Sequence, residues 1–182
     1  YTSLQSGQEA AKSPEPEFTD LDLGMVIREV TAQFETLCQA EGYLLETDIR
    51  PGLLVRGSRQ QLSRVLYNLI DNGLSHSGEN RKVCITASER KSVVRVEVRD
   101  FGEGIPRNDL PYIWERYFTL KQRKRNAKGS GLGLAISREI LLAHGAGFGV
   151  ESEEGEGSVF WFELEKRSPE ETGMKQENQP HA

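Results

Sequence analysis

The chain is poor in cysteine, methionine and tryptophan, with two of each among its 182 residues. Cys38 and Cys84 lack the spacing of a metal site, so we expect both to be reduced core residues of a cytoplasmic protein. No apolar run approaches the roughly 20 residues that a membrane span needs, and no signal-peptide pattern is present. A formal net charge of −5 argues against general nucleic-acid binding. The first residue, Tyr1, suggests a piece of a longer protein.

The composition is that of one globular domain with unstructured terminal segments, since 36% of the residues are hydrophobic and 28% are charged. Residues 1–19 are polar and contain two prolines, which predicts a linker or the end of a preceding helix. Residues 20–166 carry the periodic patterns of a folded domain. Residues 167–182 lack any periodicity, and we expect them to be disordered.

One stretch, S-V-V-R-V-E-V-R-D-F-G-E-G-I over residues 92–105, organises the chain. Its valines alternate with charged residues, which predicts a half-buried strand, and Asp100 falls on the valine face. A carboxylate there is costly unless it is paired or hydrogen-bonded. Gly102 and Gly104 follow at once and let backbone approach a ligand closely. The pattern fits a site for a flat heterocycle with donors, such as adenine; the alternative is a strand that ends in an ordinary glycine turn.

Residues 58–75 form the clearest predicted helix, with Ser58 and Gln61 as a capping box and an apolar stripe at helical spacing. Asn68, Asn72 and Ser75 make a polar row beside that stripe. Asparagine is a poor residue inside a helix, so a role as oxygen ligand to Mg²⁺ or its phosphates would explain the row. The alternative is a solvated helix face.

The remaining segments alternate strands and helices. We expect one helix between Asp20 and Gly42, and two short strands, 43–49 and 53–55, around a Pro-Gly turn. A hairpin of 82–88 and 92–99 follows, then a short aromatic helix after Pro111. A basic loop, 121–128, leads to glycines 129–133 that open another helix, where a phosphate is favoured. Strands 149–151 and 158–164 close the domain.

This order of motifs resembles the catalytic, ATP-binding domain of bacterial sensor histidine kinases, within the GHKL superfamily that includes gyrase B. N-L-I-D-N-G at 68–73 is similar to the N box of that family, and D-F-G-E-G-I at 100–105 to its G1 box. I-W-E-R-Y-F at 113–118 is similar to the F box, and G-S-G-L-G-L-A-I at 129–136 to the G2 box. The resemblance covers about residues 20–165. H-G at 144–145, with G-E-G-S-V-F-W-F-E-L at 155–164, resembles the closing hairpin of the family. Five such elements in the family's order are far more specific than any one of them.

The resemblance implies a two-layer α/β sandwich, the Bergerat ATP-binding fold, with a mixed sheet, helices on one face and a mobile lid at 119–130. It also implies ATP and Mg²⁺ as ligands. Asp100 would accept from the adenine amine, Asn72 with Asn68 would hold Mg²⁺, and lid cations such as Lys121 and Arg123 would assist catalysis. The nucleotide-contacting residues that the resemblance implies are Asn68, Asn72, His76, Asp100, Gly102, Gly104, Ile105, Tyr117, Phe118, Gly129, Ser130, Gly131, Leu132, Gly133 and Ser158.

The chain departs from the family pattern at two cations. Ser75 stands where a lysine usually follows the N box, and Thr119 where many members carry an arginine after the F box. His76, His144 and His181 do not fit a phosphoacceptor motif, so the resemblance implies that the accepting histidine lies on a separate dimerisation domain.

The expected function is therefore protein-histidine kinase activity in a two-component system. The partners would be that dimerisation domain and a response regulator, without nucleic acid and without direct membrane contact by this cytoplasmic domain, although the parent protein would be a membrane sensor. Two alternatives stay open: a nucleotide-binding scaffold that transfers no phosphoryl group, and an ATPase or serine kinase with the same fold.

Overall fold

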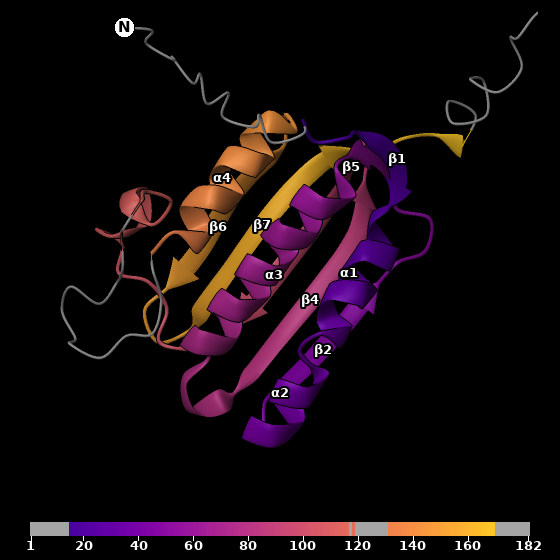
Figure 1. Ribbon diagram of the computed structural model, residues 1–182. Coiled ribbons are helices and arrows are strands. Elements are labelled where there is room, and N and C mark those ends of the chain that lie inside the picture. The colour runs from indigo at the N-terminus through magenta and orange to yellow at the C-terminus, as the bar shows by residue number, and fades with distance from the viewer. Residues whose placement is uncertain (1–14, 117, 119–130, 170–182) are drawn as a thin grey trace, which may run out of the picture.

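The computed structural model describes residues 15–116, 118 and 131–169, and its centre is a five-stranded mixed sheet (Figure 1). The strand order is β2-β4-β5-β7-β6, with β2 parallel to β4 and the other neighbours antiparallel. The strands of this sheet are β2 (Leu44–Ile49), β4 (Lys82–Arg90), β5 (Val93–Asp100), β6 (Gly147–Glu153) and β7 (Gly157–Glu165). Strands β2 and β6 are therefore the two edges.

The helices cover one face of this sheet, and α3 crosses its middle between α1 and α4 (Figure 1). The α-helices are α1 (Leu23–Ala32), α2 (Glu35–Glu41), α3 (Arg59–His76) and α4 (Gly133–Ala143), and the short 3₁₀ turns are Gly78–Asn80 and Leu110–Tyr112. The predicted mixed sheet with helices on one face is confirmed. The predicted lid, residues 119–130, lies outside the described residues.

The core lies between the two layers because each inner strand alternates. Val94, Val96 and Val98 of β5 are at most 2% exposed, and they meet the apolar stripe of α3 that begins at Leu62 and Val65. Burying large apolar side chains supplies most of the stability of such a domain.

Arg95 organises the face of the sheet that no helix covers. Its guanidinium lies over the Trp161 ring at 4.1 Å from the centroid, and it pairs with Glu97 at 2.7 Å and Glu163 at 3.0 Å. The Arg95 side chain is 11% exposed. The cation is therefore largely withdrawn from solvent and its two carboxylates are half-buried, so these pairs are less screened by salt than fully exposed ones.

A small second sheet joins the two ends of the domain. Strand β1 (Thr19–Asp22) pairs antiparallel with β3 (Leu54–Gly57), and the backbone N–H of Arg167 donates to the carbonyl of Leu54. The sequence did not predict β1, whose four residues lie inside the expected linker and helix start. The strands predicted at 43–49 and 53–55 exist, but they belong to different sheets.

Three local predictions were wrong. The single helix predicted between Asp20 and Gly42 is two helices, because the chain breaks at Gln33 and Phe34; Gly42 does end the second in the left-handed conformation, with φ +71°. The aromatic helix after Pro111 is a 3₁₀ turn within the described residues. Cys38 is buried as expected, but Cys84 is only half-buried and its thiol lies 3.4 Å from a carboxylate oxygen of Glu46.

Candidate functional site

The Asp100 carboxyl group is the buried acid that the strand pattern predicted. It ends β5 on the helix-facing side and is 2% exposed. Its Oδ1 accepts from the backbone N–H of Gly102 at 3.0 Å. Burial raises the pKa of this carboxyl above its ordinary value, and backbone hydrogen bonds from Gly102 and Ser158 oppose that shift only in part. A group held this way has acceptor capacity left for a ligand.

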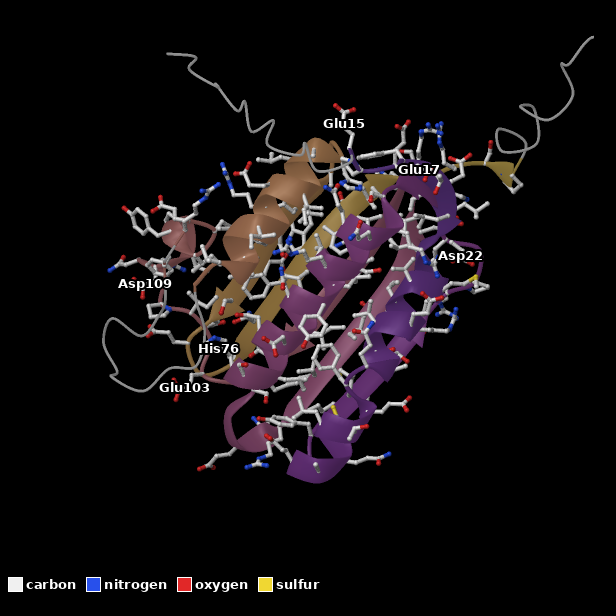
Figure 2. All side chains as sticks on the ribbon, viewed as in Figure 1. Glu15, Glu17, Asp22, His76, Glu103 and Asp109 are labelled. Atoms are coloured by element: carbon white, nitrogen blue, oxygen red, sulfur yellow. The ribbon has the colours of Figure 1, made fainter. Side chains whose placement is uncertain are left out.

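The loop after Asp100 is packed so tightly that only glycine fits at two positions. A Cβ on Gly102 would lie 1.6 Å from the carbonyl oxygen of His76, and one on Gly104 would lie 2.1 Å from that of Glu153. Gly104 also has φ +71°. The Asp100 loop therefore runs between the end of α3 and the β6–β7 turn. Figure 2 shows His76 and Glu103 together at this end of the molecule, opposite Glu15 and Glu17.

Ser158 and Ser152 continue the polar row that Asp100 begins. Ser158 pairs with Asp100 across β5 and β7 and with Ser152 across β7 and β6, so the three side chains form one row across the ends of these strands, on the helix-facing side. The two hydroxyl oxygens are 2.9 Å apart. Ser152 also accepts from the backbone N–H of Ile105 at 2.8 Å.

The two asparagines of α3 are in different situations. Asn68 donates through Nδ2 to the carbonyl of Gly133 at 3.0 Å and to the Ser137 hydroxyl at 3.2 Å, which joins α3 to the first turn of α4. Both amide hydrogens are therefore used, and Oδ1 is the atom left for a ligand. Asn72, half-buried one turn further on, has no side-chain hydrogen bond to any residue that the structure describes.

The first turn of α4 adds backbone donors near Asn68. Gly131 has φ +67°, and Leu132 precedes the helix without a side-chain cap bond. The N–H groups of the first turn have no helical partner and carry the positive end of the helix dipole. Anions are favoured at such a place.

The aromatic motif after the loop is anchored in the core. Ile113 is 3% exposed, and the Trp114 ring lies edge-on to Phe148 at 5.1 Å and to Phe160 at 5.6 Å between centroids. Phe118 is half-buried near Tyr112, with 6.4 Å between ring centroids. The residues just before the predicted lid thus pack against the core.

Several predicted site residues lie outside the described part of the chain, namely Tyr117, Lys121, Arg123, Gly129 and Ser130, together with the departure at Thr119. Of the others, the structure brings Asp100, Gly102, Gly104, Ile105 and Ser158 together with His76 at one end of α3. Asn68 meets Gly133 between α3 and α4, and Asn72 lies on α3 between these two groups.

Sequence reasoning missed three residues that shape this region, namely Ser137, Ser152 and Gly157. It also missed the ring of His144, which lies at the opposite, N-terminal end of α3. Gly157 has φ +90°, and a Cβ there would lie 2.2 Å from the carbonyl oxygen of Asp100. The His144 ring accepts from the Ser58 N–H at 3.1 Å, in place of the Gln61 side chain that a full capping box would use. Only the pairing of Ser152 and Ser158 across a hairpin could have been anticipated from the sequence.

The candidate magnesium ligands in the described part of the chain are the amide oxygens of Asn68 and Asn72. Among residues 15–116, 118 and 131–169, no group of three His, Cys, Asp or Glu side chains could hold a metal ion. The oxygens of Asn68 and Asn72 are the hard ligands that Mg²⁺ accepts alongside phosphates and water. The donor set therefore fits Mg²⁺ carried by a nucleotide.

The helices of the described residues include none that is long and apolar enough to cross a membrane.

Curated proteins similar to this chain are sensor kinases. Sensor histidine kinase WalK of Bacillus subtilis is 34% identical over 122 residues, which are 65% of this chain and 20% of that protein. Sporulation kinase C of the same organism is 30% identical over 83% of this chain and 35% of that protein. The chain thus spans about a fifth to a third of the length of these relatives.

Solved structures give the same result for the fold. The nucleotide-free catalytic domain of histidine kinase ThkA aligns with a TM-score of 0.72 and 34% identity, covering 82% of this chain and 96% of that one. ThkA in complex with the response regulator protein TrrA aligns with a TM-score of 0.71 and 32% identity, over 84% of this chain and 42% of that one.

Residues 57–168 match the family described as histidine kinase-, DNA gyrase B- and HSP90-like ATPases. This segment contains α3, the Asp100 loop, α4 and the strands β4 to β7. The motifs, the fold and the relatives agree, and the chain belongs to this family of nucleotide-binding ATPase domains, on the branch of the sensor histidine kinase catalytic domains.

Proposed function

We propose that this domain binds Mg·ATP and donates the γ-phosphoryl group to a histidine on a separate dimerisation domain. One observation carries the proposal: a carboxylate that is 2% exposed stands beside a loop where no Cβ fits, next to the end of α3, and two asparagine amides follow along that helix. A buried acid is costly and is kept where a ligand uses it.

The adenine end of the site follows from hydrogen-bond chemistry. Asp100 accepts from the exocyclic amine of the base, which supplies the donors that a buried carboxylate lacks. Gly102 and Gly104 let the loop backbone lie against the ring plane, and Ile105 closes the apolar side. His76 and Ser158 flank this pocket from α3 and β7.

The phosphate end depends on α3 and α4. Asn72 offers an uncommitted amide oxygen to Mg²⁺, and Asn68 offers Oδ1 while its Nδ2 holds α4 in place. Bound Mg²⁺ would neutralise phosphate charge. Gly131, Leu132 and Gly133 present backbone N–H groups to the phosphates, and Gly129 and Ser130 precede them in the chain. Lys121 and Arg123 would supply cations in place of the lysine and arginine that the family has near Ser75 and Thr119.

In the transfer itself, a nitrogen lone pair of the accepting imidazole forms the new P–N bond. The bond from the γ-phosphorus to the bridging oxygen breaks, and ADP leaves. This chain contributes position and charge neutralisation, which are the main requirements of phosphoryl transfer. Tyr117 and Phe118 would anchor the lid hinge beside the core aromatic Trp114.

The proposed partners are the dimerisation domain and a response regulator. ThkA has been solved with a response regulator, which supports that class of partner here. Nucleic acid is not among the proposed partners, and we propose that the domain works on the cytoplasmic side of a membrane-bound parent without touching the membrane. The domain would span residues 20–166.

The test supplies the dimerisation domain of the parent protein to this chain with γ-labelled ATP and Mg²⁺. We expect acid-labile, alkali-stable label on a histidine of that domain, and a loss of at least tenfold with Asn72→Ala. Arg64→Ala, which changes an exposed side chain of the same helix, should label like the unaltered chain. Absence of label at saturating ATP would reject the transfer.

A nucleotide-binding domain without phosphoryl transfer is the second candidate. Two sequence features support it, Ser75 and Thr119, because each replaces a cation that would face phosphate. This alternative predicts binding of Mg·ATP in calorimetry together with no label on the accepting histidine.

A further inference from the structure

The polar row that begins at Asp100 contains one residue that the proposed function does not use. Ser152 lies on β6, half-buried, and is the third member of the row that runs across β5, β7 and β6. We propose that Ser152 is a positioning residue: it leaves the side chains of Asp100 and Ser158 able only to accept hydrogen bonds, and so selects a purine with an amine at ring position 6. The inference rests on the proposed function and names a determinant of its base specificity.

The Ser152 hydroxyl has three polar neighbours within hydrogen-bond distance. They are the backbone N–H of Ile105 at 2.8 Å, the carbonyl oxygen of Gly157 at 2.8 Å and the Ser158 hydroxyl at 2.9 Å. The first can only donate and the second can only accept. A hydroxyl has one proton to give and two lone pairs.

Only one arrangement of protons satisfies all three contacts. Ser152 gives its proton to the Gly157 carbonyl and accepts from Ile105 and Ser158. In the other arrangement Ser152 donates to Ser158 and the Gly157 carbonyl loses this bond. Because Gly157 is buried, leaving its carbonyl oxygen without this hydrogen bond is costly, and the first arrangement prevails.

The consequence reaches the ligand through Ser158. Its proton is used by Ser152, so its remaining lone pairs lie beside the Asp100 carboxylate, which also only accepts when ionised. An adenine amine has two N–H donors and matches these two acceptors. Hypoxanthine and guanine carry a carbonyl oxygen at ring position 6, which would face acceptors alone.

Ser152 also holds the loop that lies against the base. Its bond to Ile105 joins the loop to β6, and the N–H of Gly155 donates to the carbonyl of Glu103 at 2.8 Å. The β6–β7 turn therefore supports the loop at two points. One of them depends on the Ser152 side chain.

The first experiment measures amide hydrogen exchange of the nucleotide-free protein by NMR. In Ser152→Ala we expect the Ile105 amide to exchange at least tenfold faster, while the Val96 amide in the centre of β5 is unchanged. Ser152→Thr, which keeps the hydroxyl, should restore the protection. Equal Ile105 exchange in the folded alanine variant and the unaltered chain would overturn the support role.

The second experiment measures the affinities for Mg·ATP and Mg·ITP by calorimetry. Ser152→Ala frees the Ser158 proton for a carbonyl at ring position 6, so the ratio of the ITP to the ATP dissociation constant should fall about tenfold, the worth of one hydrogen bond. Ser88→Ala, a serine change on the uncovered face of β4, should leave the ratio unchanged. An unchanged ratio in Ser152→Ala would overturn the specificity role.

A double-mutant cycle separates Ser152 from a general loss of stability. If Ser152 acts through Ser158, adding Ser152→Ala to Ser158→Ala should change the ratio no further. Independent effects of the two changes would contradict that route. Should the alanine variant fail to fold, Ser152→Cys gives the same comparison, because a thiol is only a weak donor and acceptor.

The outcomes distinguish the inference from the proposed function. If the unaltered chain binds neither nucleotide, the proposed function and the specificity role both fail, and the exchange of Ile105 still decides whether Ser152 supports the loop. If ATP binds and the ratio does not move, the proposed function stands and only the role of Ser152 is rejected.

Discussion

Replacing Asp100 by asparagine should weaken ATP binding without weakening the fold. The substitution keeps the shape of the side chain and an oxygen that can accept from the Gly102 N–H at 3.0 Å. It replaces the second acceptor oxygen by an NH₂ group that would face the adenine amine. Losing a hydrogen bond to a buried charged group costs about 1.5–3 kcal/mol, so we expect affinity to fall roughly 10- to 150-fold in calorimetry.

The nucleotide-free protein should respond in the opposite direction. Burial raises the pKa of Asp100, so the ionised carboxylate destabilises the folded state at neutral pH. An amide avoids that cost, so the free energy of unfolding of Asp100→Asn at pH 7.5 should be higher than that of the unaltered chain. Because the folded pKa lies above the unfolded one, the contribution that favours folding is fully present below the unfolded pKa and is lost as pH rises through the folded pKa.

The difference in the free energy of unfolding between Asp100→Asn and the unaltered chain should therefore shrink as the pH is lowered from 7.5 towards the ordinary pKa of aspartate. Urea unfolding at several pH values measures it, with Asp48→Asn on the exposed side of β2 as the control. A variant that is less stable at pH 7.5 and binds ATP as well as the unaltered chain would refute the reasoning.

Three further changes test other parts of the site. Gly104→Ala should unfold the loop or the domain in thermal melts, because its Cβ would meet a backbone oxygen at 2.1 Å; Gly155→Ala, also at positive φ but with nothing within 4 Å, should cost only about 1 kcal/mol of backbone strain, and equal effects would contradict the steric account. His144→Phe should lower the free energy of unfolding by about 1–3 kcal/mol, because the Ser58 N–H loses its partner; urea unfolding without a change would exclude that bond from the stability of the domain. Asn72→Ala should raise the Mg²⁺ concentration that half-saturates ATP binding while leaving the melting temperature near that of the unaltered chain. Asn68→Ala should lower the melting temperature as well, since Asn68, unlike Asn72, donates hydrogen bonds to α4.

The periodic elements of this fold could be predicted from the sequence. The alternation of Val94, Val96 and Val98 fixed both the strand and the buried side of Asp100, because a strand has only two faces. The stripe that begins at Leu62 did the same for α3. In both cases a single face had to be buried, and the period left no other solution.

The pairing of short elements could not be predicted in this way. Strand β1 has four residues, too few to show a period, and it exists because β3 lies beside it. Strand β3 is in turn bridged at Val55 by Lys166, the residue after β7. The two strands around Pro51 were predicted, but nothing local indicates that β2 joins β4 in parallel. Tertiary contacts decide such cases.

In the site, too, contacts between residues adjacent in the sequence could be predicted and long-range contacts could not. The glycines and Asp100 were expected to lie together because they adjoin in the sequence. The bonds of Asn68 to Gly133 and of Ser152 to Ile105 join residues that are 65 and 47 positions apart, and no local pattern reports them. Long-range polar contacts of this kind are visible only once the strands are in register.

The two edge strands have a consequence for how the protein behaves in concentrated solution. Within the described ranges, strands β2 and β6 each have one neighbouring strand, so the outer backbone of each is a template for adding a strand from another molecule. Glu46 and Asp48 lie on one edge, and Glu151 and Glu153 on the other. If two copies joined β2 to β6, like charges would meet across the new ladder, so the acidic edges discourage the sheet from growing into a fibre at neutral pH.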